Sequence, residues 1–124
     1  KEISLYIHIP FCKQRCFYCD FPTFAGKERF REDYVEALIK EIEDKCSNYL
    51  IKTIFIGGGT PSYLEEKELE KLLIAVSKLN LSDKLEYSIE CNPGTVNEDK
   101  LKIMKKYGIN RIKLWASNLV IISY

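Results

Sequence analysis

The sequence predicts an α/β fold in which parallel strands carry helices on their outer side. Three observations indicate it. Short apolar runs rich in β-branched residues alternate with longer amphipathic segments, most of the apolar runs are closed by a Pro or Gly turn, and the resulting order is β-α-β-α-β-α-β. Right-handed crossovers in such a chain produce a parallel sheet or barrel with helices outside. Functional residues are then expected in the loops that follow the strands.

The first predicted strand and the first predicted helix enclose a cysteine-rich loop, residues 11–24. Residues Ile3–Ile9 alternate between apolar and polar side chains, the period of a half-buried strand, and Pro10 ends them. Lys27–Ser47 is predicted to be a helix because apolar residues recur every four positions along one face while charged residues fill the others. That face consists of Phe30, Tyr34, Leu38 and Ile42.

The second unit begins with a buried strand at Ile51–Ile56, which a glycine-rich turn closes. Ser62 followed by Glu65 has the spacing of a capping box, and it predicts a helix over Glu65–Leu79. The expected core face of this helix is Leu69, Leu72, Leu73 and Val76.

Two further strands follow, Leu85–Cys91 and Ile109–Leu114, joined by a helix over Glu98–Tyr107 that Asn97 caps and Gly108 ends. Strand starts are spaced by about 35 residues, so a closed barrel of eight such units needs roughly 280 residues. The 124 residues hold about three and a half units, and we expect their edge strands to be exposed.

Charge and hydropathy exclude several classes of function. Lys and Arg number 19 against 18 Asp and Glu, so no cationic surplus is available for phosphates, and we expect no nucleic-acid partner. No apolar run approaches the roughly 20 residues that cross a bilayer, and the first residues lack the pattern of a secretion signal. We therefore expect no transmembrane segment and a cytoplasmic location.

Three of the five cysteines, Cys12, Cys16 and Cys19, lie within eight residues directly after the first strand. An odd number of clustered cysteines disfavours a disulfide framework and favours a metal or cluster. Since a 4Fe-4S cluster held wholly by protein uses four cysteines, three leave one iron open to a substrate or cofactor. A zinc site completed by His8 or Asp20 and three reduced thiols are the alternatives.

The spacing Cys12-x3-Cys16-x2-Cys19 resembles the signature of radical S-adenosylmethionine (SAM) enzymes. Three segments, residues 5–12, 55–62 and 86–95, narrow the resemblance to the family of oxygen-independent coproporphyrinogen III oxidases. Asp20-Phe21 stands where the true oxidases have a glycine and a further cysteine, and it favours the HemW-type heme chaperone branch. The match runs from about residue 3 to 114, the N-terminal third or so of such a protein.

The resemblance implies the N-terminal portion of a radical-SAM (β/α) partial TIM-like barrel, with parallel strands and outer helices. It also implies that the three cysteines hold a 4Fe-4S cluster whose open iron binds the amino and carboxylate groups of SAM. An electron, from a donor such as flavodoxin, would then cleave the sulfonium C–S bond and yield a 5′-deoxyadenosyl radical, while the protein supplies positioning. Heme or a porphyrinogen is the implied further partner of the whole protein.

Six residues match family positions that touch SAM: Tyr6, Tyr18, Gly58, Gly59, Thr60 and Glu90. The glycines and the threonine would contact its methionyl end, the tyrosines flank the cluster, and the glutamate would accept bonds from ribose or offset the sulfonium charge. Without the resemblance these are a tight turn, packing aromatics and a solvated strand-end carboxylate. Cys46 and Cys91 match no ligand and are expected to be small buried residues.

The sequence departs from the family after Leu114, where Trp115–Asn118 replace an expected Gly-Val-Gln-Ser whose Gln contacts SAM. One permitted set of codons for Trp115 to Leu119 encodes Gly-Val-Gln-Ser when it is read two bases later. We hypothesise a frame change near residues 112–114, which makes residues 115–124 a non-family tail. Four interpretations stay open: a heme chaperone, a coproporphyrinogen dehydrogenase, a zinc module and an inactive truncated fragment. Only the second of them is an enzyme by definition.

Overall fold

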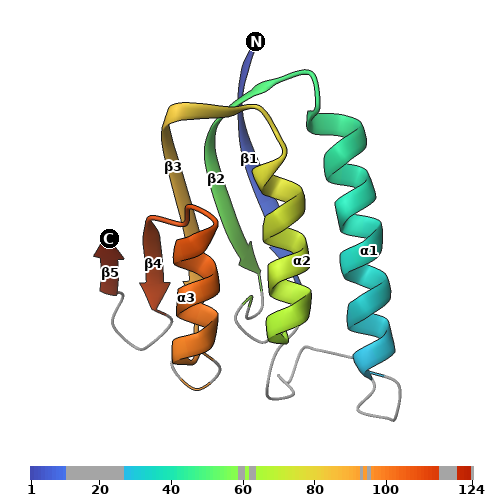
Figure 1. Ribbon diagram of the computed structural model, residues 1–124, viewed down its shortest axis with the longest axis vertical. Coiled ribbons are helices and arrows are strands. Elements are labelled where there is room, and N and C mark those ends of the chain that lie inside the picture. The colour runs from blue at the N-terminus through green and yellow to red at the C-terminus, as the bar shows by residue number, and fades with distance from the viewer. Residues whose placement is uncertain are drawn as a thin grey trace.

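The computed structural model describes residues 1–10, 27–58, 61, 64–92, 94, 96–114 and 120–123. In these ranges five strands form one sheet in the order β1-β2-β3-β4-β5, and three helices connect its first four strands (Figure 1). Strands β1 to β4 are mutually parallel, and β5 runs antiparallel to β4. The elements are β1 (Glu2–Ile9), α1 (Lys27–Cys46), β2 (Leu50–Gly58), α2 (Glu66–Ser77), β3 (Leu81–Cys91), α3 (Glu98–Lys106), β4 (Arg111–Leu114) and β5 (Val120–Ser123).

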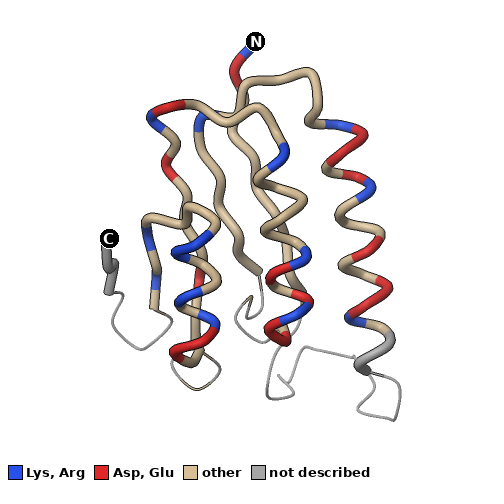
Figure 2. The backbone as a smooth tube through the Cα atoms, viewed as in Figure 1, with Lys and Arg blue, Asp and Glu red and all other residues tan. Residues whose placement is uncertain are grey.

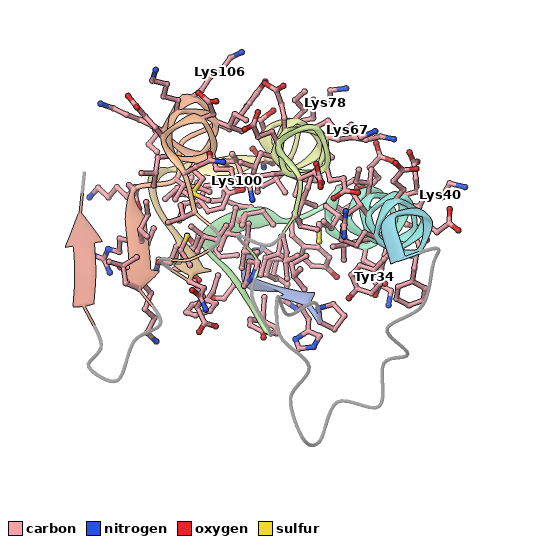
Figure 3. The ribbon with its side chains drawn as sticks, turned by 90° about the horizontal axis from the view of Figure 1, so that it is seen from below. Tyr34, Lys40, Lys67, Lys78, Lys100 and Lys106 are labelled. Carbon is pink, nitrogen blue, oxygen red and sulfur yellow. The ribbon has the colours of Figure 1, made fainter. Side chains whose placement is uncertain are left out.

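All three helices cover the same face of the sheet, which is the expected α/β arrangement (Figures 1 and 3). The apolar side chains of β1, β2 and β3 that alternate toward the helices are buried with the apolar stripes of α1 and α2. Leu69, Leu72, Leu73 and Val76 are fully buried, which confirms the predicted core face of α2. The opposite face of the sheet carries no helix among the described residues.

Charged residues of both signs follow the outer surfaces of the helices, whereas the central strands carry few (Figure 2). This pattern leaves the apolar stripes to face the sheet, as amphipathic helices require. Within the described ranges, no helix is both long enough and apolar enough to cross a membrane.

The predicted start of the second helix is wrong in its capping residues. Glu65 is the N-cap residue of α2, and its backbone N–H donates to Oε1 of Glu68 at 2.9 Å. The capping box therefore lies three residues later than the predicted Ser62 and Glu65 pair. The carboxylate of Glu68 can fill this position because an ion pair with Arg31 compensates its burial, which is a tertiary contact. By contrast, Asn97 caps α3 as predicted, accepting from the N–H of Lys100 at 2.8 Å.

Strand β3 begins at Leu81, four residues before the predicted start. Ser82, Asp83 and Lys84 lack the apolar alternation of a strand, but the parallel neighbour β2 extends the pairing. The N–H of Ile51 donates to the carbonyl of Asn80 at 2.8 Å, and Ile51 pairs with Leu81. Backbone pairing rather than side-chain pattern decides this boundary.

Strand β5 was not expected, because the predicted order ended with a fourth strand. It pairs with β4 in antiparallel register, from Arg111 opposite Ser123 to Leu114 opposite Val120. β5 therefore covers the open backbone groups of β4 and is itself the edge strand at this end of the sheet. At the other end of the strand order, β1 is an edge strand.

Candidate cofactor site at the carboxyl ends of the strands

Four residues form a row across the face of the sheet that lies opposite the helices. His8 of β1 pairs with Gly57 of β2, and Glu90 of β3 pairs with Lys113 of β4. The two pairs are neighbours, because Ile56 pairs with Ile89 one residue earlier on β2 and β3. The row lies near the carboxyl ends of four parallel strands, where α/β proteins assemble their sites.

The carboxylate of Glu90 lies against the backbone of β2 at Gly57. A Cβ atom at Gly57 would be 2.5 Å from Oε1 of Glu90 and 2.5 Å from the ring of Phe55, both well inside van der Waals contact. Only glycine therefore lets Glu90 occupy this position. Glu90 itself is half-buried, so its carboxylate is accessible from the open face of the sheet.

Gly58 is required at the end of β2 for two separate reasons. Its φ of +118° is a conformation that side chains with a Cβ rarely adopt. An added Cβ would also lie 2.6 Å from the carbonyl oxygen of Ile9 and 2.9 Å from Nδ1 of His8. The ends of β1 and β2 therefore approach each other closely here.

Aromatic side chains of β1 and β2 lie beside this row. The Tyr6 hydroxyl and Nδ1 of His8 are 3.1 Å apart. The centres of the Tyr6 and Phe55 rings are 5.8 Å apart. Nζ of Lys113 lies 5.3 Å from the centre of the Phe55 ring, within the range of a cation–π contact. Tyr6 is 56% exposed, so it is not a residue of the core. It presents its ring to the open face.

Helix α1 anchors the end of β1 through Tyr34, whose hydroxyl donates to the carbonyl oxygen of His8 at 2.6 Å. Burial, followed by the negative charge of Glu41, raises the pKa of Tyr34 above its ordinary value. The phenol therefore stays protonated and able to donate at neutral pH. Tyr34 was predicted only as part of the core face of its helix, and its hydroxyl gave no sign of this second contact.

The structure brings three of the predicted SAM contacts, Tyr6, Gly58 and Glu90, to one end of the sheet. The others, Tyr18, Gly59 and Thr60, and the three predicted cluster ligands, Cys12, Cys16 and Cys19, lie outside the described residues. In the described part of the chain no group of three or more His, Cys, Asp or Glu side chains is placed to hold a metal ion. Cys46 and Cys91 are buried, as expected, and neither forms a disulfide bond within the described residues.

Sequence analysis did not single out Gly57, Lys113 or Arg31. Gly57 was identified only as part of the glycine turn, and its special role depends on a carboxylate from another strand. Lys113 and Arg31 carried no signal beyond their charge.

Residues 6–116 match the family model of the Radical SAM superfamily. The chain belongs to the radical SAM superfamily. The matched range includes all three clustered cysteines, Glu90 and the glycine turn.

Relatives within the radical SAM superfamily include two proteins named heme chaperone HemW. The one from Synechocystis is 46% identical over 119 residues, and the one from Escherichia coli is 43% identical over 117 residues. Each alignment covers 90% of this chain but only 29% and 31% of the respective relative. The chain thus spans about three tenths of the length of these relatives.

A solved structure shares the radical SAM fold of this chain. It is the coproporphyrinogen III oxidase HemN from Escherichia coli, described as a radical SAM enzyme, with a TM-score of 0.74 and 28% sequence identity. The match covers 90% of this chain and 27% of that protein. The expected fold class, the N-terminal part of the radical SAM fold, is therefore confirmed.

Proposed function

We propose that this chain binds a 4Fe-4S cluster through Cys12, Cys16 and Cys19 and binds SAM at the carboxyl ends of β1, β2 and β3. The observation that carries this proposal is the placement of Glu90, whose carboxylate lies against Gly57 one residue before the close approach at Gly58. The cysteine segment, residues 11–26, leaves the sheet at the same end of β1. The proposed cluster ligands therefore follow in the chain from the strand end beside which the proposed SAM contacts Gly58 and Glu90 lie.

The chemistry of the donors fits both groups. Three thiolates suit a cluster with one open iron, and when bound to SAM such a cluster supplies the electron that cleaves the sulfonium C–S bond. Because Gly58 has no side chain, we propose that the methionyl end of SAM approaches its backbone closely, and that Gly59 and Thr60 are further contacts of SAM. The carboxylate of Glu90 is placed to accept hydrogen bonds from ribose hydroxyls or to offset the sulfonium charge. Tyr6 and Tyr18 complete the proposed contacts.

For the whole protein we propose the role of a heme chaperone that delivers heme to apoproteins, which the relatives named HemW support. Coproporphyrinogen dehydrogenation, supported by the likeness to HemN, is the second candidate. A donor such as flavodoxin would reduce the cluster. Three clustered cysteines and two buried ones that form no disulfide suit a reducing compartment, so we propose that the protein works in the cytoplasm.

The test of cluster and SAM binding is anaerobic reconstitution of the chain with iron and sulfide. We expect about four irons per chain and an electron paramagnetic resonance spectrum of the reduced protein that changes when SAM is added. If the protein contains zinc and no sulfide, the proposal is wrong and the chain is a structural zinc module. If a cluster forms but its spectrum does not change when SAM is added, the chain is an inactive fragment.

Glu90→Gln provides a sharper version of the same test. The substitution keeps the size of the side chain but removes its charge, so we expect the SAM concentration that gives half of the spectral change to rise about tenfold, the effect of about 1.4 kcal/mol. Iron content should not change. Glu86→Gln is the matched control, because Glu86 lies on the same strand and pairs with Arg111 at 2.6 Å. Equal effects of the two variants would contradict the role of Glu90.

We also propose that residues 1–124 are the N-terminal part of a radical SAM core domain whose last ten residues, 115–124, arise from a frame change. Residues 115–119 and 124 lie outside the described structure. Sequencing the gene tests this proposal, since the codon of Ala116 must be GCG and that of Ser117 must be TCC. Any other codon at either position refutes it.

A further inference from the structure

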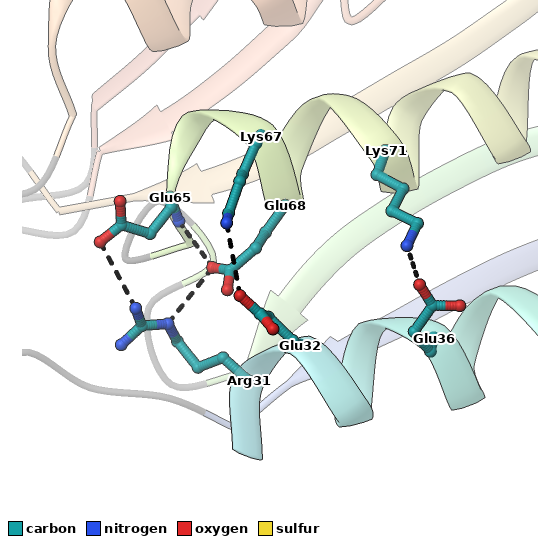
Figure 4. A network of polar contacts seen from close by, with 7 residues as sticks. All are labelled: Arg31, Glu32, Glu36, Glu65, Lys67, Glu68 and Lys71. Carbon is teal, nitrogen blue, oxygen red and sulfur yellow. Dashed lines mark hydrogen bonds and ion pairs between the residues drawn. The ribbon is translucent and has the colours of Figure 1, made fainter. Parts of the chain in front are cut away.

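A cluster of polar contacts joins the first turns of α1 to the start of α2 (Figure 4). Nε of Arg31 donates to Oε1 of Glu68 at 3.2 Å, and Nη2 of Arg31 donates to Oε1 of Glu65 at 3.4 Å. The same Oε1 of Glu68 accepts the backbone N–H of Glu65 at 2.9 Å. One guanidinium is therefore bonded to both residues of the capping box at the start of α2.

The central pair of this cluster is buried. The side chains of Arg31 and Glu68 are only 7% and 4% exposed. Burying two charges is costly, and two apolar side chains of similar volume would often stabilise the same contact as well. An ion pair also restricts how the two side chains are oriented, because the planar guanidinium binds its carboxylate in a narrow range of geometries. This pair therefore fixes how α1 and α2 are placed at one end.

Tyr34 makes the corresponding contact to β1. It lies three residues after Arg31, one turn further along α1, and its hydroxyl donates to the carbonyl of His8 near the end of β1. The first two turns of α1 are thus bonded to both the end of β1 and the start of α2. We call Arg31, Tyr34 and Glu68 the α1 anchor.

The α1 anchor lies near the ends of the elements that two proposed site segments connect, the cysteine segment and the segment that follows Gly58. The cysteine segment leaves β1 after Ile9 and enters α1 at Lys27, and the chain runs from Gly58, at the end of β2, to α2 at Glu66. Two neighbouring ion pairs between α1 and α2 differ in exposure. Those of Lys67 with Glu32 and Lys71 with Glu36 have side chains that are about half exposed or more.

We propose that Arg31, Tyr34 and Glu68 are positioning residues for SAM binding. By bonding α1 to the end of β1 and to the start of α2, they fix the described residues from which the cysteine segment and the segment after Gly58 extend, and through these the proposed cluster ligands and SAM contacts. This inference rests on the proposed function. It adds three residues that need not touch the cluster or SAM themselves.

The experiment compares Arg31→Gln, Glu68→Gln and Tyr34→Phe in the reconstituted chain. We expect each to keep about four irons, since all three cluster ligands belong to one segment. The SAM concentration for half of the spectral change should rise about 10- to 100-fold in Arg31→Gln, the range found when residues behind a metal site are replaced. Arg31→Lys, which restores the charge without the planar fork, should recover part of the loss.

Two controls separate positioning from general stability. Glu36→Gln removes an exposed ion pair between the same two helices, and Val76→Ala opens a cavity at the far end of α2, where Val76 is fully buried. Neither should change the SAM concentration for half of the effect. Thermal unfolding of every variant shows whether Val76→Ala and Arg31→Gln lose similar stability.

The outcomes are distinct. If Arg31→Gln and Val76→Ala respond to SAM alike at similar stability, or if the anchor variants lose their iron, the positioning role is refuted. If Arg31→Gln does not fold, Tyr34→Phe and Arg31→Lys decide by the same comparison. If the unsubstituted chain forms no cluster or does not respond to SAM, the proposed function fails and this inference fails with it.

Discussion

Gly58→Ala should strongly destabilise the chain and abolish its response to SAM. The positive φ of Gly58 costs an alanine about 1–3 kcal/mol. The added Cβ would also lie 2.6 Å from the carbonyl oxygen of Ile9, and because this oxygen belongs to the backbone, the contact can be relieved only by separating β1 from β2. Overpacking of this kind costs a further ~1–3 kcal/mol. Urea unfolding measures the total, and the spectral titration with SAM measures the functional loss.

Gly108→Ala is the matched control for this substitution. Gly108 also has a positive φ, +96°, but an added Cβ would meet no atom within 4 Å. Its replacement therefore carries only the conformational cost, and we expect it to lose roughly half as much stability as Gly58→Ala and to keep its response to SAM. If Gly108→Ala is as damaging as Gly58→Ala in both measurements, the close approach of β1 and β2 is not what Gly58 provides.

Replacing any one of Cys12, Cys16 and Cys19 with alanine should reduce the iron content from about four per chain to background. Three thiolates are already one fewer than a 4Fe-4S cluster held wholly by protein uses, so two cannot retain it under reducing conditions. Iron and sulfide analysis after anaerobic reconstitution measures the loss, and visible absorbance follows it independently.

Cys46→Ala is the control for the three cysteine variants. Cys46 is buried near the end of α1, and burial raises the pKa of its thiol, which keeps it protonated and a poor ligand. The variant should bind as much iron as the unsubstituted chain. Loss of iron in Cys46→Ala to the same extent, or retention of four irons without Cys12, would contradict the assignment of the ligands.

The local signals in the sequence correctly predicted most of the fold. Alternating apolar residues located β1, the spacing of leucines located the buried face of α2, and Asn97 and Gly108 marked both ends of α3. These features depend on neighbours within a few positions, so they are visible along the chain. The cysteine spacing is equally local, and the proposal that it holds a cluster stays a prediction.

Boundaries that depend on a partner were predicted less well. The capping residues of α2 depend on an arginine from another helix, the start of β3 depends on pairing with β2, and β5 forms against the edge of β4. Each is decided by a backbone or side chain of a different helix or strand.

The sequence by itself determined the order of the first seven elements, the apolar face of α2, and the candidate residues of the cysteine triad, Gly58 and Glu90. Only the tertiary structure decided that Glu90 lies against Gly57, that Tyr34 binds the end of β1, and that Arg31 joins α1 to α2. The physical reason is register. The packing of whole strands and helices decides which of their residues meet. Tyr34 and His8 are 26 residues apart in the chain, and Arg31 and Glu68 are 37 apart, so no local pattern contains that information.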